Sequence, residues 1–195
     1  LPRTNPTIST ITSGTTYPSG WRVPTFSIER TDADHSAVQR VCNLLNHCGQ
    51  DPQPADNMSL IDHSVPLPAG DRIVKEIDGP ATIRQFFAKL DSQERWARRK
   101  VVLQIHFDGE PIPAVDAPIG DFFGDAWNES PYSSLPMGIT EDLNYCYWRM
   151  PFAKSAKIVF INEGRQSAKL HYKVTYLPGK LPDHSGMFHA KWRRD

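Results

Sequence analysis

Carboxylates and aromatic side chains gather between positions 108 and 127. The acids are Asp108, Glu110, Asp116, Asp121 and Asp125, and the aromatic residues are Phe122, Phe123 and Trp127. Glycoside hydrolysis needs two carboxyl groups, one ionised and one protonated, beside the bond that breaks. Aromatic rings stack on the apolar faces of sugars, so one interpretation is a sugar-binding rim formed by Asp121, Phe122, Phe123 and Trp127. The other is that the acids cap turns and the Phe pair is buried, which the spacing alone favours because Asp-Gly and Gly-Asp pairs are common in turns.

A second group of charged residues lies near the N-terminus, in Glu29-Arg30-Thr31-Asp32 followed by Asp34-His35. An arginine beside carboxylates can donate two hydrogen bonds to one ligand. The same residues also suit a surface ion pair, which contributes little to stability. The residue types by themselves favour neither interpretation.

Other chemistries lack their motifs. The chain has seven histidines and three cysteines, but no HxH, HExxH or CxxC pattern of zinc ligands. It has no GxSxG nucleophile motif and no glycine-rich phosphate loop. Cys146 lies in an apolar segment, where a thiol is normally inert, and a bridge between Cys42 and Cys48 stays open. We therefore predict neither a metal nor a cofactor.

The composition excludes two classes of partner. Lys plus Arg and Asp plus Glu both number 22 in a chain of 195 residues, so net charge does not predict binding to nucleic acid. No run of 18 apolar residues is present, and we expect no membrane span. The chain starts with Leu1-Pro2 without a signal-like apolar core, which leaves a secreted, periplasmic or cytoplasmic location open.

The elements that must position these residues are mostly strands. Residues 1–24 are rich in Thr, Ser, Pro and Gly and predict an extended arm, and 34–47 has the apolar spacing of a short helix. The strand-like segments are 72–77, 82–90, 100–107, 145–150, 157–161 and 170–176. Six or seven short strands without βαβ rhythm favour an antiparallel sandwich, jelly roll or immunoglobulin-like. The Cys–Trp–Cys spacing of immunoglobulin domains is absent.

Four motifs together resemble glycoside hydrolase family 172, first grouped as domain of unknown function 2961. They are PAGDRIVKEIDGPATIRQFF (68–87), LQIHFDGEPIPAVDAPIGDFFG (103–124), MPFAKSAKIVFIN (150–162) and FHAKWRRD (188–195). Their order and spacing match the family. Where the family has Gly-Pro-Gly before the aromatic strand, this chain has Gly79-Pro80-Ala81.

A fifth segment, FSIERTDAD (26–34), resembles the serine-rich family segment that ends in Asp-Arg-Thr-Gly-Gly-Asn. Arg30 and Thr31 match, Glu29 stands in place of the Asp, and Asp32-Ala33 replaces the two glycines. In the family this segment lies near the substrate. The resemblance therefore implies that Glu29, Arg30 and Thr31 bind substrate.

The resemblance implies a mainly β fold: an antiparallel jelly-roll sandwich with one short helix, half of a double jelly roll. Residues 1–57 would form the arm, the substrate-proximal segment and the helix, and 58–187 the jelly-roll body. Residues 188–195 would begin the linker to a second jelly roll, which is absent here. We expect the chain to form a homotrimer or hexamer, or to pair with a second jelly-roll chain.

The implied activity is retaining hydrolysis by two glutamates. The substrates would be α-D-fructofuranosides, difructose dianhydrides or D-arabinofuranosides. The resemblance implies that the catalytic glutamates belong to the second jelly roll, so we expect the catalytic pair outside this chain. The alternative is a non-catalytic jelly-roll module for assembly or carbohydrate binding.

Overall fold

The computed structural model describes residues 20, 28–125, 130–141, 143–183 and 185–193. The chain divides into two compact units, 1–38 and 39–195. Helix α1, Asp32–Asn46, starts in the first unit and ends in the second. No helix of the described residues is both long and apolar enough to cross a membrane.

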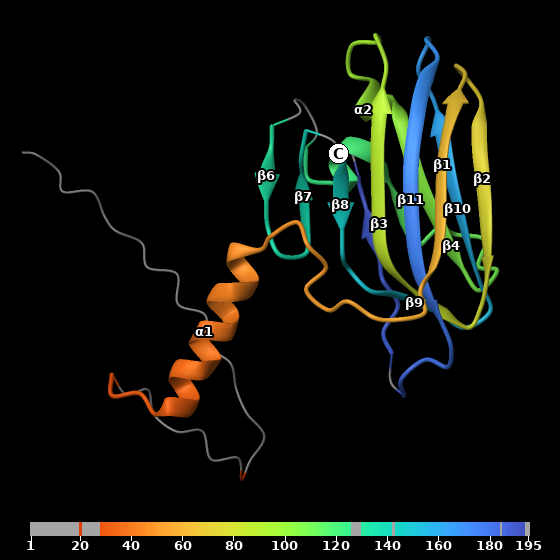
Figure 1. The fold of residues 1–195 in the computed structure, drawn as a ribbon. Helices are drawn as coiled ribbons and strands as arrows, with labels where there is room; N and C mark the ends of the chain where they lie inside the picture. The colour runs from red at the N-terminus through yellow and green to blue at the C-terminus, as the bar shows by residue number, and fades with distance from the viewer. Residues whose placement is uncertain (1–19, 21–27, 126–129, 142, 184, 194–195) are drawn as a thin grey trace, which may run out of the picture. The chain divides into compact units, whose positions relative to one another are not determined.

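The second unit contains a β-sandwich (Figure 1), whose larger sheet has seven strands among the described residues. Its order is β1-β11-β3-β8-β7-β6, and β9 also pairs with β3. The bounds are β1 Ser59–Leu67, β3 Ala81–Asp91, β6 Tyr132–Ser133, β7 Met137–Ile139, β8 Asn144–Cys146, β9 Met150–Phe152 and β11 Ala168–Pro178.

The smaller sheet has five strands among the described residues, in the order β12-β5-β4-β10-β2. The bounds are β2 Arg72–Asp78, β4 Val101–Phe107, β5 Val115–Pro118, β10 Ser155–Asn162 and β12 Ala190–Lys191. Residues 190–191, which the sequence assigns to the start of a linker, thus pair in parallel with β5.

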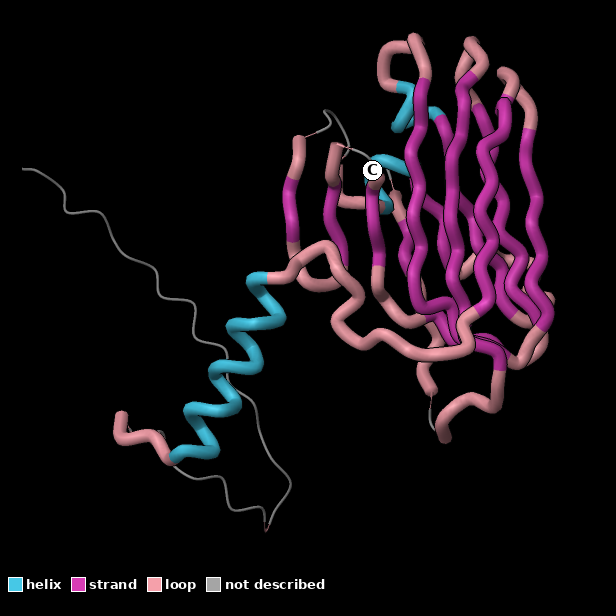
Figure 2. The backbone as a smooth tube through the Cα atoms, viewed as in Figure 1, coloured by secondary structure: helices cyan, strands magenta, loops and turns pink. Residues whose placement is uncertain are grey.

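The strand order is that of a jelly roll. Strands β1, β11, β3 and β8 with β9 lie in one sheet, and β2, β10, β4 and β5 lie in the other. Consecutive strands such as β1 and β2, or β3 and β4, therefore alternate between the sheets, as two Greek keys require. The predicted antiparallel jelly-roll sandwich is confirmed, and helices are few and short (Figure 2).

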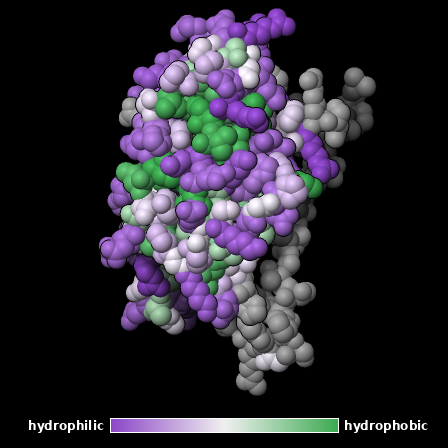
Figure 3. Space-filling view, turned by 90° about the vertical axis from the view of Figure 1, so that its right-hand side faces the viewer, coloured by the Kyte–Doolittle hydropathy of each residue, from purple (hydrophilic) through white to green (hydrophobic). Residues whose placement is uncertain are grey.

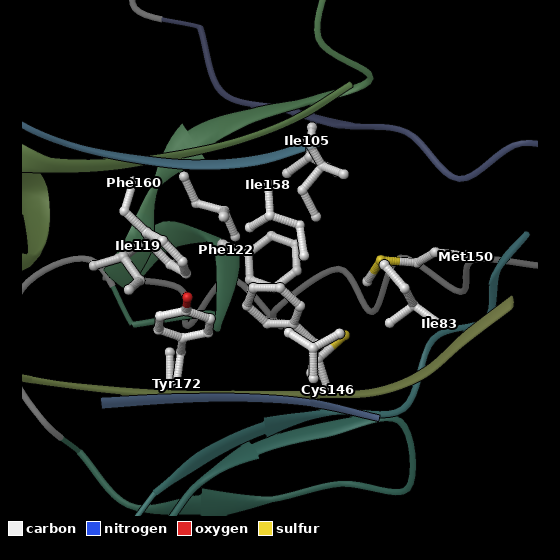
Figure 4. Packing of buried hydrophobic residues seen from close by; sticks show 14 of the residues in the cluster. Ile83, Ile105, Ile119, Phe122, Cys146, Met150, Ile158, Phe160 and Tyr172 are labelled. Carbon is white, nitrogen blue, oxygen red and sulfur yellow. The ribbon is translucent and has the colours of Figure 1, made fainter. Parts of the chain in front are cut away.

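Alternation along the strands places the core between the sheets. In β4 the residues at 101, 103, 105 and 107 are buried, and those between them are half-buried. In β11, Leu170, Tyr172 and Val174 face the same core, as their spacing predicted. Strand β10 is paired with β2 on one side and β4 on the other, and its consecutive residues 158–160 are all buried, in agreement with its nearly continuous apolar sequence. Figure 4 shows Ile105, Ile158, Phe160 and Tyr172 packed within the core.

One predicted strand is interrupted. The segment 145–150 divides between β8 and β9, because Tyr147, Trp148 and Arg149 leave the ladder. The Tyr147 hydroxyl donates to the carbonyl oxygen of Gly49 at 2.5 Å, and Trp148 is 49% exposed. A contact distant in sequence therefore overrides the local aromatic strand propensity.

Two one-turn helices occur that the sequence did not predict, α2 Ala97–Lys100 and α3 Ile119–Phe122. Helix α1 lies close to its predicted range. None of its residues is buried, so tertiary packing within the described chain contributes little to it.

Candidate functional site

The acidic stretch after β5 is fixed by two ion pairs. Arg99 Nη1 lies 3.0 Å from Asp121 Oδ1, and Arg98 Nη1 lies 3.3 Å from Asp125 Oδ2. The guanidinium of Arg99 also lies 5.0 Å from the ring centroid of Trp192. Helices α2 and α3 thus hold these acids at a partly buried corner of the sandwich.

Electrostatics and packing at this corner indicate a structural role. Burial raises the pKa of Asp121, Arg99 opposes the rise, and Asp125 adds to it. A Cβ atom at Gly120 would lie 2.4 Å from the carbonyl oxygen of Asp125, so glycine is required where the loop closes on itself. The Gly120-Asp121 pair therefore forms part of a tight turn, as its composition suggested.

Two of the aromatic residues of this stretch, Phe122 and Phe123, lie in the core. Phe123 is fully buried and Phe122 is 6% exposed, and Figure 4 shows Phe122 within the apolar cluster. Their rings pack edge-to-face with centroids 5.0 Å apart. Neither ring offers a face to a sugar in this structure. Trp127 lies outside the described residues.

The remaining acids at this end of the sheet bond within the chain or lie at the surface. Asp108 has a positive φ of 57° and its Oδ1 accepts from the backbone N–H groups of Lys154 and Ser155. Burial acts to raise the pKa of Asp108, but hydrogen bonds from 153–155 outweigh it and lower that pKa. Asp116 accepts from Gln104 at 3.1 Å.

The N-terminal group Glu29, Arg30 and Thr31 is exposed in the first unit. Thr31 precedes α1 and forms a capping box with Asp34: the Asp34 N–H donates to Thr31 Oγ1 at 3.2 Å, and the Thr31 N–H donates to Asp34 Oδ2 at 2.9 Å. The bonds that the Thr31 N–H and hydroxyl donate to the Asp34 carboxylate lower the pKa of Asp34. Thr31 therefore has a helix-starting role besides any role in binding.

A cavity within the second unit is a candidate site for a ligand, and the sequence did not predict it. Its volume is about 380 Å³, within the range of small-molecule sites. It is lined by Arg40, Asn43, Leu44, His47, Gln50, Asp51, Pro52 and Leu135. The combination of apolar walls with hydrogen-bonding groups suits a single sugar ring.

Contacts with the larger sheet position this cavity. Asp51 accepts from Gln85 at 3.0 Å and lies 3.4 Å from Arg149. His47 Nδ1 lies 2.6 Å from the carbonyl oxygen of Asn43. In the sequence, residues 40, 43, 44 and 47 share one helix face just before a Pro-rich loop, and this pattern could have indicated the cavity. Leu135 becomes part of the lining only through the fold.

A second cavity brings two glutamates together. Glu76 of β2 and Glu110 of the β4–β5 turn line a volume of about 320 Å³ with His106 and Lys157. Both glutamates are exposed. Strand pairing aligns Glu76, Lys157 and His106 in one row across β2, β10 and β4, which sequence spacing did not reveal.

Metal-ligand and thiol chemistry gain no support. The described residues contain no group of three or more His, Cys, Asp or Glu side chains placed to hold a metal ion. Cys42, Cys48 and Cys146 are free. Burial raises the pKa of the Cys146 thiol to about 12, in keeping with the inert role predicted for it.

The comparison with known protein families concerns the residues that form the jelly roll. Residues 58–174 match the family described as GH172 domain-like, and this range runs from β1 into β11. The search of curated proteins finds no match. The match spans more than half of the 195 residues and contains three of the four motifs whose resemblance the sequence suggested. The chain therefore belongs to the GH172 domain-like family.

Proposed function

We propose that this chain is the first jelly roll of a glycoside hydrolase that acts on furanosides. The substrates would be α-D-fructofuranosides, difructose dianhydrides or D-arabinofuranosides, and the mechanism would be retaining with two glutamates. The chain would supply part of the sugar pocket. Family membership over residues 58–174 is the observation that carries the proposal.

The cavity beside α1 supports a sugar-binding role. Leu44, Pro52 and Leu135 supply apolar contact, while Arg40 and Asn43 supply hydrogen-bond donors. Such a mixture orients a hydroxylated ring and shields its apolar face. Glu29 and Arg30 belong to the other unit, and their role in binding rests on the family resemblance.

We place bond cleavage outside this chain. A catalytic acid at neutral pH needs a protonated carboxyl group, which buried apolar surroundings favour. Glu76 and Glu110 are both exposed, and the family resemblance assigns the catalytic glutamates to the second jelly roll. The catalytic glutamates would therefore belong to a second jelly roll.

A non-catalytic assembly or carbohydrate-binding module is the second candidate. One exposed apolar side chain on the smaller sheet favours it, because Val74 of β2 is 47% exposed, whereas its partner Val159 of β10 is only 5% exposed. Figure 3, which looks onto the edge of the sandwich where β1 and β2 lie, shows apolar residues among polar ones. Such a surface suits a partner roll.

Binding of furanosides to the chain tests the proposal. Isothermal titration with methyl α-D-arabinofuranoside and with a difructose dianhydride should detect binding. Arg40→Ala and Glu29→Ala should each weaken it about tenfold, the effect of losing one charge-assisted hydrogen bond. Glu29→Ala should leave the melting temperature nearly unchanged, because Glu29 is exposed.

The matched control is Gln39→Ala, which changes the neighbouring helix position outside the cavity and should bind normally. Absence of binding to either furanoside, or equal binding by all variants, would remove the sugar site from this chain. Hydrolysis by residues 1–195 alone would contradict the placement of the catalytic pair.

A further inference from the structure

A separate cavity rich in cationic groups lies on the larger sheet, where β3, β9 and the end of β11 meet. Its volume is about 330 Å³. Arg84, Arg149 and Lys180 line it, together with the hydroxyl-bearing Thr82 and Ser185. None of its described lining residues is an acid, so the cavity is electropositive.

The two arginines meet at one backbone carbonyl. Arg84 Nη2 and Arg149 Nη2 both donate to the carbonyl oxygen of Gln53, at 2.5 and 3.0 Å. Arg149 Nη1 also donates to the carbonyl oxygen of Arg84 at 3.4 Å. These contacts hold the guanidinium groups side by side at the cavity wall.

Their donors are not all used. Arg84 Nε is buried and has no hydrogen-bond partner among the described residues. Leaving a buried donor without a partner is costly, most of all on a charged group. The bonds to Gln53 therefore do not satisfy this guanidinium.

The charge is also incompletely balanced. Asp51 Oδ1 lies 3.4 Å from Arg149 Nη2, and the same carboxylate accepts from Gln85 through Oδ2. Burial and the neighbouring Arg84 lower the pKa of Arg149, against the opposing effect of Asp51. The Asp51 carboxylate thus pairs with Arg149 alone of the two arginines, and the Lys180 ammonium adds a further positive charge to the cavity lining.

We propose that this cavity binds an oxyanion, either the carboxylate of an acidic sugar or a phosphate group. Arginine presents its N–H groups in a fork that matches both anions. An oxyanion bound in the cavity would offset the repulsion between the two guanidinium groups. Thr82 and Ser185 offer hydroxyl groups to the rest of the ligand.

Titration of the full chain with two anions tests the site. Sodium glucuronate and inorganic phosphate, each at constant ionic strength set with chloride, should bind, whereas glucose should not. Arg149→Gln and Lys180→Gln should weaken binding, the first by at least about tenfold. Lys180 is exposed in a loop, so its variant keeps the test valid if changes at the half-buried arginines unfold the chain.

Arg72→Gln is the matched control, because it removes the same charge from an exposed position on the smaller sheet. Its anion affinity should equal that of the parent chain. Binding of glucuronate alone would identify a carboxylate site, and binding of phosphate alone a phosphate site. No binding of either anion, or equal loss with Arg72→Gln, would overturn the proposal. The site requires no furanoside binding, so its failure would leave the proposed function untouched.

Discussion

At the scale of single residues, the acids of the β4–β5 region mostly shape backbone. Asp108, in the turn after β4, ties that turn to the start of β10 by accepting from the N–H groups of Lys154 and Ser155. Asp121 and Asp125 fix the corner formed by α2 and α3 through arginines. These carboxylates rigidify the loops through contacts within the chain. Any contact with a ligand would be a second role.

The charge on Asp108 should matter only above its titration range. Asp108→Asn keeps an oxygen acceptor and tolerates the positive φ of 57°, but loses charge-assisted bonds of about 1 kcal/mol. The folded-state pKa lies below the ordinary 3.8, so this stabilisation is present above pH 3.8 and disappears as pH falls through the folded-state pKa.

Urea unfolding of both proteins between pH 2.5 and pH 7 measures this difference. A difference in unfolding free energy that does not change with pH would show that the charge is unimportant. Asp108→Ala should destabilise more at every pH, because alanine tolerates the left-handed backbone poorly.

At the scale of elements, the sandwich and α1 depend on different forces. The strands are fixed by burial between two sheets. Helix α1 has no buried residue, and isolated helices of its 15 residues are marginal in water. Its capping box and the acids in its first turn, Asp32 and Asp34, therefore carry much of its local stability.

Thr31→Ala should lower the helix content of α1. The change removes an N-cap acceptor worth about 1 kcal/mol, and that amount is decisive for an element with little tertiary support. Far-UV circular dichroism near 222 nm should show the loss, while the melting of the β-sandwich stays unchanged. Ser36→Ala is the control inside the helix; an equal loss in both variants would mean that the cap does not act.

At the scale of the whole molecule, unburied apolar surface points to association. Val41 and Leu45 of α1 are 53% and 55% exposed and stand four residues apart on one face. Burying side chains of this size stabilises an interface by about 1.5–3 kcal/mol each. The expected homotrimer or hexamer would give this face a partner.

The double change Val41→Ser and Leu45→Ser should therefore reduce the assembly mass. Light scattering coupled to size exclusion should find a trimer or hexamer for the parent chain and a smaller species for the variant. Gln39→Ser, on the same helix, should not change the mass. A monomeric parent chain, or a variant of unchanged mass, would contradict helix-mediated assembly.

The alternation of apolar and polar residues was enough to predict a β-sandwich from the sequence. Period-two alternation in β4 and β11 placed the correct side chains in the core, because one face of each strand must leave water. The helix at 34–47 and the family could also be predicted, because helical spacing and motifs both depend on residues that are near in sequence. The candidate site was less predictable: the burial of Phe122 and Phe123 agrees with the interpretation that their spacing favoured, but the cavity beside α1 was not predicted.

Contacts between polar groups that are distant in sequence could be seen only in the three-dimensional fold. In the fold, Arg84 and Arg149 both donate to the carbonyl oxygen of Gln53. Leu135 lines one cavity with residues of α1, and Glu76 lines another with Glu110. Jelly-roll connections bring strands far apart in sequence side by side, and no local periodicity encodes that pairing. The chain's own pattern therefore specifies its core, whereas its cavities arise from the order in which the strands are joined.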